Sequence, residues 1–142
     1  MTEKVLLVDD EEDFVEPLAE RMRARGMNVS TTTSPTEALA KTENESFDAI
    51  VLDLMMPEMD GLQTLEAIKK KNPDIQVILL TGHATVEKGI EAMKHGAMDF
   101  LEKPVDIKSL AERIQKAQAK KMVLVEKKNE EKIRNIILNK SW

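Results

Sequence analysis

Five side chains that can bind a metal ion or a phosphoryl group each follow an apolar segment of the chain. They are Asp9, Asp10, Asp53, Thr81 and Lys103. Mg²⁺ prefers oxygen ligands and is commonly held by one or two carboxylates together with water and phosphate oxygens. A lysine ammonium can pair with a phosphoryl oxygen, and a threonine hydroxyl can donate a hydrogen bond to it. If the five meet, the sequence predicts magnesium-dependent phosphoryl transfer with Asp53 as the nucleophile.

The apolar segments that precede these side chains are typical of β-strands. The clearest, Ala49–Leu52, contains no polar residue and is typical of a strand buried on both faces of a sheet. It ends at Asp53, and the residues Pro57 and Asp60-Gly61 that follow are signals for a tight loop. The other strands are expected at Lys4–Val8, Met27–Thr32, Ile75–Leu80 and Ala97–Leu101.

Helices are expected between these strands. The pattern Ser34-Pro35-Thr36-Glu37 is a capping box with proline at the first helical position, so a helix should follow to about Asn44. Pro17 is tolerated only near the first turn of a helix, so the first helix is expected to begin late and to end at Gly26. The remaining helices are expected at about Leu62–Lys71, at about Ala84–Lys94 with His95-Gly96 closing it, and after Asp106, the expected N-cap.

The order of these elements predicts the fold class. Five strands that alternate with five helices indicate an α/β protein with a doubly wound parallel sheet and helices on both faces. In such a sheet the carboxyl ends of the strands share one edge, where ligands bind, so the five polar side chains should meet there. Three carboxylates in one crevice repel each other, and a divalent cation such as Mg²⁺ removes that conflict.

Composition narrows the function classes further. A length of 142 residues with 42% hydrophobic and 33% charged residues favours one globular domain with its own core. The segment from Gln118 onward has a net charge of +4, which leaves −9 for the first 117 residues and argues against nucleic-acid binding by that body. The chain has no cysteine, no apolar run of membrane-spanning length and no signal-peptide pattern, so a cytoplasmic location is expected.

With these residues in place, the chain resembles the receiver domains of bacterial two-component response regulators over about residues 3–118. The matching motifs stand in order at the ends of the expected strands. They are Asp9-Asp10, Asp53 with Met56-Pro57 and Asp60-Gly61 after it, Thr81-Gly82, and Lys103-Pro104. The stretch from Thr81 to Pro104 is most similar to receivers attached to activators of the alternative-sigma-factor class. The resemblance implies a flavodoxin-like sheet with strand order 2-1-3-4-5.

The resemblance also implies a metal site and a phosphoacceptor. Asp53 would accept the phosphoryl group. Asp10, Asp53 and the backbone carbonyl of Met55 would bind Mg²⁺, and Asp9 would support the ion through water. Haloacid-dehalogenase-like enzymes carry an acid two residues after such an aspartate, whereas this chain has Met55, so turnover of outside substrates is not expected. Met55 and His83 lie near the expected site, and changing either is expected to alter autodephosphorylation more than folding.

The remaining roles implied by the resemblance concern the switch. Thr81 would move toward the phosphoryl group, Lys103 would pair with it, and Phe100 would be the aromatic switch residue. The Lys103-Pro104 peptide is expected to be cis. A sensor histidine kinase would donate the phosphoryl group, and the surface of the fourth helix, fifth strand and fifth helix would then control an output domain or partner. Gly89 weakens the fourth helix by about 1 kcal/mol relative to alanine, which suits a moving element.

Two rival functions are less consistent with the residues. A dinucleotide-binding domain would need a glycine-rich turn after the first strand, where this chain has five consecutive acids, 9–13. A receiver-like scaffold that is never phosphorylated would not need all five polar residues of the site. The two histidines, His83 and His95, stand alone on different expected loops and are interpreted as surface residues.

The C-terminal segment is expected to form a second region. We predict a receiver domain at residues 1–118 and a helical extension or linker at 119–142, which continues the fifth helix. Its apolar residues form a partial stripe interrupted by Asn129 and Lys132. A linker to an output domain and a homodimer contact are both consistent with this pattern, because two or three heptads are too few to decide.

Overall fold

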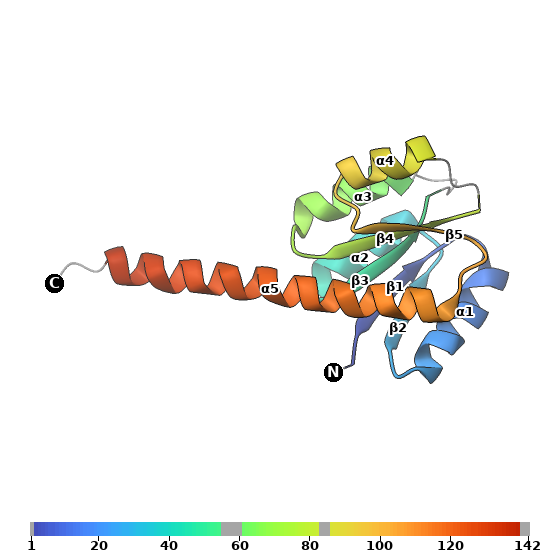
Figure 1. Cartoon of the computed structure of the whole chain (residues 1–142), viewed down its shortest axis with the longest axis horizontal. Coiled ribbons are helices and arrows are strands. Elements are labelled where there is room, and N and C mark those ends of the chain that lie inside the picture. The colour runs from blue at the N-terminus through green and yellow to red at the C-terminus, as the bar shows by residue number, and fades with distance from the viewer. Residues whose placement is uncertain (1, 55–60, 83–85, 140–142) are drawn as a thin grey trace.

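The computed structural model describes residues 2–54, 61–82 and 86–139, and in this part of the chain five strands alternate with five helices (Figure 1). The strands are β1 (Lys4–Val8), β2 (Asn28–Thr32), β3 (Ala49–Asp53), β4 (Gln76–Thr81) and β5 (Asp99–Glu102). The helices are α1 (Glu12–Ala24), α2 (Pro35–Asn44), α3 (Gly61–Lys71), α4 (Val86–Lys94) and α5 (Ile107–Asn139).

The sheet is parallel with strand order β2-β1-β3-β4-β5, which confirms the predicted fold and order. Alternate residues of the central strands enter two separate cores, because successive side chains of a strand point to opposite faces. Val5 and Val51 join α1 and α5 on one face, and Leu6 and Leu52 join α2, α3 and α4 on the other. β1, β3 and β4 are therefore covered on both faces, and their carboxyl ends are held at one edge of a rigid sheet.

The start of α1 differs from the prediction. The helix begins at Glu12, and Pro17 is its sixth residue rather than part of its first turn. Proline costs a helix one backbone hydrogen bond, here the bond to the carbonyl of Asp13. Both residues are exposed, so water can bind this carbonyl in place of the missing N–H. The earlier start has a consequence for the site, because it places Phe14 on the first turn of the helix.

Most helix ends agree with the expected capping residues. The Oγ atom of Ser34 accepts a hydrogen bond from the backbone N–H of Glu37 at 3.3 Å, as a capping box requires. Asp106 accepts hydrogen bonds from Ser109 at the start of α5. Gly26 and Gly96 follow α1 and α4 with φ of +91° and +101°, a left-handed conformation in which glycine is not strained.

Strand β1 has the expected bounds, and the bounds of the other strands shift by one or two residues. β5 shows the largest change, since it begins at Asp99 and ends at Glu102, whereas Ala97–Leu101 was expected. Helix α4 is described from Val86 onward, and the expected start at Ala84 lies outside the described residues. Edge strands and helix ends are the parts of a fold that local sequence determines least.

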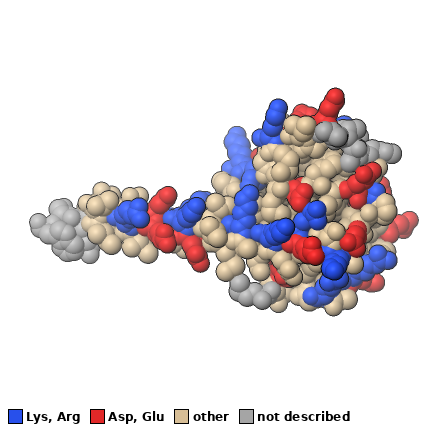
Figure 2. All heavy atoms as spheres, in the orientation of Figure 1, with Lys and Arg blue, Asp and Glu red and all other residues tan. Residues whose placement is uncertain are grey.

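Helix α5 is much longer than the other helices and projects beyond the sheet (Figure 1), and the space-filling view shows charged side chains of both signs along the projecting part (Figure 2). Its first half packs on the core through four buried residues, Leu110, Ala111, Ile114 and Ala117. From Val125 to Asn139 every residue is exposed, including Ile136 at 62% and Leu138 at 73%. In the described part of the chain, no helix has the length and apolar character needed to span a bilayer.

Candidate functional site

Three carboxylates meet at the carboxyl edge of the sheet, as the sequence predicts. Asp9 follows β1, Asp10 is the next residue, and Asp53 ends β3. One carboxylate oxygen from each can be chosen so that all three lie within 4.8 Å of one another. Asp9 and Asp53 are buried, whereas Asp10 is exposed to solvent. The cluster is thus open on one side, where a ligand or a water-bound ion can enter.

Lys103 lies in the same cluster. Its Nζ atom is 2.7 Å from Oδ2 of Asp9 and 3.6 Å from Oδ2 of Asp53. The side chain of Lys103 is only 11% exposed, against 1% for Asp9 and 5% for Asp53, so these charges are close together in a poorly hydrated site. Glu11 adds a more distant carboxylate oxygen at 3.8 Å, and its own side chain is well exposed.

The protonation of Lys103 is set by these acids. Burial alone would lower its pKa, because a charged ammonium loses hydration. The close contact with Asp9 and the negative charges of Asp9, Asp53 and Glu11 outweigh burial and raise the pKa of Lys103 above its ordinary value. Lys103 therefore carries a full positive charge at neutral pH and can pair with an incoming anionic group.

Phe14 is a site residue that the sequence interpretation missed. The Nζ atom of Lys103 lies 4.3 Å from the centre of the Phe14 ring, within the range of a cation–π contact. The rest of the Phe14 side chain is partly buried against the core that includes α1 and α5. One feature of the sequence indicates that Phe14 lies near the site, namely its position four residues after Asp10. The expected late start of the helix obscured this indication.

The backbone at the end of β3 is tightly packed. The N–H of Gly61 donates a hydrogen bond to the carbonyl oxygen of Leu54 at 2.6 Å. A Cβ atom at position 61 would lie 2.4 Å from the Leu54 Cα and 2.7 Å from its oxygen, so only glycine fits. Met55, with the other loop residues 56–60, and His83 lie outside the described residues, so their expected roles stay predictions.

Thr81 and Phe100 lie on the neighbouring strands β4 and β5. Thr81 is buried at the end of β4, and its backbone carbonyl accepts a hydrogen bond from the N–H of Lys103 at 2.7 Å. Phe100 is partly buried and packs against the core beneath α4, where a Cβ atom at Gly89 would be 3.7 Å from its ring. The peptide bond between Lys103 and Pro104 is cis, as expected.

The donor set at this edge fits a hard divalent cation. Oδ1 of Asp9 already accepts the backbone N–H of Glu11 at 2.9 Å. Oδ2 of Asp9 is buried and accepts no well-aligned hydrogen bond from the described residues, although it is in ion-pair contact with Lys103. A buried carboxylate oxygen with remaining lone-pair capacity, close to two other carboxylates, is a suitable partner for an ion or its bound water.

His95 is not part of this site. It follows α4, and its Nδ1 atom lies 2.6 Å from Oε1 of Glu66 on α3. The interpretation of His95 as a surface residue is consistent with its side-chain exposure of 37%, although the structure gives it an acidic partner that the sequence did not reveal.

A search for related proteins identifies the family. The sequence model described as the response regulator receiver domain matches residues 5–115. The chain belongs to the response regulator receiver family. The fold of this receiver agrees, since the receiver domain protein from Clostridium thermocellum is 38% identical, with a TM-score of 0.81 over 86% of this chain and 98% of that chain.

Two further relatives extend the comparison. The transcriptional regulatory protein ZraR of Salmonella typhimurium is 40% identical over 115 residues, which are 81% of this receiver and 26% of ZraR. The beryllofluoride-activated NtrC4 receiver domain dimer is 36% identical, with a TM-score of 0.79 over 83% of this chain and 98% of that chain. This receiver thus spans about a quarter of the length of the curated relatives. Its family consists of regulatory phosphoacceptors that act as phosphorylation-dependent switches in two-component signalling.

Proposed function

We propose that Asp53 is the phosphoacceptor of this receiver. The observation that carries the proposal is the position of the Lys103 ammonium, which lies within 3.6 Å of Asp53 and between carboxylates from different strands. An acid at the end of a central buried strand is rigidly held and open to ligands at the carboxyl edge. A haloacid-dehalogenase-like enzyme would carry a further acid two residues after this aspartate, where this chain has Met55.

Asp10 and Asp53 are proposed to hold Mg²⁺ together with the backbone carbonyl of Met55, and Asp9 is proposed to support the ion through water. When bound, Mg²⁺ supplies positive charge that offsets the negative charge of the phosphoryl oxygens. The fit of the three carboxylate oxygens, all within 4.8 Å of one another, supports this assignment.

The chain's own residues provide the rest of the chemistry. A carboxylate oxygen of Asp53 attacks phosphorus and forms a new O–P bond, while the bond from phosphorus to the leaving nitrogen of a phosphohistidine, or to the leaving oxygen of acetyl phosphate, breaks. Lys103 pairs with a phosphoryl oxygen, and the Thr81 hydroxyl donates a hydrogen bond to another. Attack by water on the same phosphorus restores Asp53, so the receiver would catalyse its own phosphorylation and dephosphorylation.

The signal is proposed to leave through the surface of α4, β5 and α5. Ile90 and Met93 on α4 are about half exposed, so this surface carries apolar groups that a partner can cover. Gly89 makes α4 an element of low intrinsic stability. Movement of Thr81 toward the phosphoryl group would change the packing next to Phe100, which lies beneath this helix.

The partners follow from the same proposal. A sensor histidine kinase would be the phosphodonor in the cytoplasm, and the output would be a partner protein or a domain following the receiver. An activator of the alternative-sigma-factor class is the output favoured by the similarity to ZraR, which is a transcriptional regulatory protein. We assign the receiver to residues 1–118 and the extension to 119–142.

Beryllofluoride tests this proposal, because it imitates a phosphoryl group on an aspartate. With Mg²⁺ present, we expect backbone amide NMR signals of α4, β5 and the first turns of α5 to shift when beryllofluoride is added. Asp53→Asn should abolish these shifts. Shifts confined to another surface, or shifts that persist in Asp53→Asn, would contradict the proposed acceptor and output surface.

The role of the extension is tested by sedimentation. The described part of the extension exposes seven large apolar residues, which fit either a linker or a homodimer contact. They are Met122, Val123, Val125, Ile133, Ile136, Ile137 and Leu138. A dimer that becomes monomeric when residues after about 120 are removed would support the contact between copies. An oligomeric state that is the same with and without these residues would indicate that the segment is a linker.

A further inference from the structure

The first part of the helical extension is in contact with the receiver body on the side away from the phosphorylation site. Lys121 donates hydrogen bonds from Nζ to Oγ of Ser46 at 2.7 Å and to the carbonyl oxygen of Phe47 at 2.6 Å. Lys128 pairs with Oδ2 of Asp74 at 2.8 Å. These contacts join residues 54 to 75 positions apart in the sequence.

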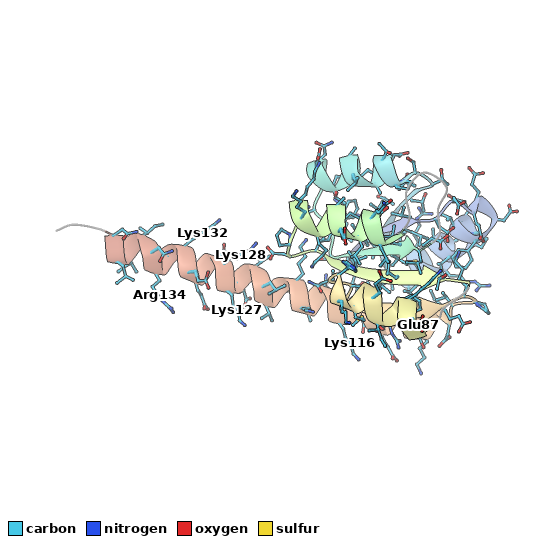
Figure 3. The ribbon with its side chains drawn as sticks, turned by 90° about the horizontal axis from the view of Figure 1, so that it is seen from above. Glu87, Lys116, Lys127, Lys128, Lys132 and Arg134 are labelled. Atoms are coloured by element: carbon cyan, nitrogen blue, oxygen red, sulfur yellow. The ribbon has the colours of Figure 1, made fainter. Side chains whose placement is uncertain are left out.

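The contacts come from a single face of α5. Ala117, Lys121, Leu124 and Lys128 are separated by four, three and four residues, a spacing that places them on one side of a helix. Exposure follows the same pattern, since Ala117 is buried and Lys121 and Leu124 are half-buried, whereas Met122 and Val123 are exposed. Figure 3 shows Lys127 and Lys128 pointing to different sides of α5.

The loops that receive these lysines are themselves fixed. Lys69 donates from Nζ to the carbonyl oxygens of Pro73 and Ile75, both at 2.8 Å, and so holds the loop that carries Asp74. The amide of Asn72 donates to the carbonyl oxygen of Thr42 at 2.9 Å and ties this loop to the end of α2. The acceptor of Lys128 is therefore held in place by contacts that do not involve α5.

The attachment is polar rather than tightly packed. A cavity of about 390 Å³ lies between the helix and these loops, and its wall includes Glu43, Asn72, Asp74, Lys121 and Val125. The Lys128 side chain is 51% exposed and its partner Asp74 is 21% exposed. Exposed ion pairs contribute little and are weakened by salt, whereas the hydrogen bond from Lys121 to the carbonyl oxygen of Phe47 is partly buried and is screened less.

We propose that Lys121 and Lys128 form a polar latch that fixes the direction in which the rest of α5 leaves the receiver. The latched segment, residues 119–128, extends ten residues beyond the boundary expected from the sequence at residue 118. After Lys128 all residues to Asn139 are exposed, so the helix has no other support from the described body. Both receiving loops lead directly into strands of the site, since Phe47 precedes β3 and Asp74 precedes β4. The latch thereby connects β3 and β4 with any segment attached to the end of α5.

Distance measurements between two spin labels test the latch without reference to phosphorylation. The chain has no cysteine, so Ala40→Cys on α2 and Asn135→Cys on α5 provide unique attachment sites. We expect a single narrow peak in the distance distribution of the spin-labelled protein that keeps both Lys121 and Lys128. Adding Lys121→Met and Lys128→Met should replace it by a broad distribution, because methionine keeps the length and helix propensity of lysine but not its charge.

A matched pair of substitutions provides the control. Lys116→Met and Lys127→Met remove the same charge from the same helix at exposed positions on another side of α5, and should leave the peak narrow (Figure 3). High salt should broaden the peak of the unsubstituted latch. The proposal is overturned by a peak that stays narrow in the Lys121 and Lys128 variant, by equal broadening in the control, or by a loss of helical circular dichroism that accounts for the broadening through fraying.

Discussion

The Nζ atom of Lys103 lies 2.7 Å from Oδ2 of Asp9, and this pair joins the end of β5 to the end of β1 across the carboxyl edge of the sheet. The two strands are not neighbours, because β3 and β4 lie between them. Asp53, at the end of β3, is 3.6 Å from the same nitrogen. One buried positive charge, that of Lys103, therefore lies beside both Asp9 and the proposed phosphoacceptor Asp53.

Lys103 should make stability depend on pH in the alkaline range. Its pKa is raised in the folded state, so its contribution is complete below the unfolded-state pKa of about 10.4 and is lost as pH rises through the folded-state pKa. Urea unfolding of the protein and of Lys103→Met should therefore differ by a constant amount from pH 7 to 9. The difference should shrink above about pH 10.4. Lys127→Met, at an exposed lysine, should show no such change, and a difference that stays constant at high pH would contradict this account.

Mg²⁺ should stabilise the fold through the acidic cluster. A ligand that binds the folded state alone stabilises by about 2.7 kcal/mol at a concentration of 100 times its Kd, so the melting temperature should rise with added Mg²⁺. Asp10→Asn should weaken this rise. Asp13→Asn removes an equally exposed acid three residues away and should leave the rise unchanged. Equal responses in both variants would show that the ion binds elsewhere.

Phe14 should contribute to the site through its ring rather than its bulk. A cation–π contact is worth about 0.5–2 kcal/mol, depending on desolvation. A double-mutant cycle in urea with Phe14→Leu and Lys103→Met should give a coupling energy in this range. Phe14→Tyr keeps the ring and should retain the coupling. A coupling of zero between Phe14 and Lys103 would mean that their 4.3 Å contact has no energetic weight.

Gly61 should tolerate no side chain, whereas Gly82 should. A methyl group at position 61 would overlap the backbone of Leu54, and overpacking of this kind costs about 1–3 kcal/mol. At Gly82 no atom of the described residues, apart from its chain neighbours, lies within 4 Å of an added Cβ, so Gly82→Ala should be neutral or stabilise by up to about 1 kcal/mol. Urea midpoints of the two alanine variants compare them directly. Similar midpoints would contradict the close approach at Gly61.

The sequence was sufficient to predict the sheet and the positions of the site residues that the structure describes. The pattern is strong because buried parallel strands have continuous apolar runs such as Ala49–Leu52, and a polar residue directly follows the run. Pro17 misled the prediction of α1, since solvent can compensate for a lost hydrogen bond on an exposed helix face. The contact of Phe14 with Lys103 joins residues 89 positions apart and becomes visible only once the fold is known.

The helical extension shows the same limit. The sequence correctly predicts that α5 continues beyond residue 118, because helix-favouring residues run on without a break. It does not reveal that Lys121 and Lys128 reach loops of the body, because a helical lysine has the same local sequence pattern whether or not it has a partner.

The most direct test of the central claim is the intact mass of the receiver after incubation with Mg²⁺ and acetyl phosphate, beside Asp53→Asn. We predict one phosphoryl adduct on the unsubstituted protein, stable in acid and lost in base as an acyl phosphate should be, and none on Asp53→Asn. An adduct of the same size on Asp53→Asn would contradict the assignment of Asp53 as the phosphoacceptor. So would a failure of the unsubstituted protein to accept phosphate from either acetyl phosphate or a phosphorylated histidine kinase.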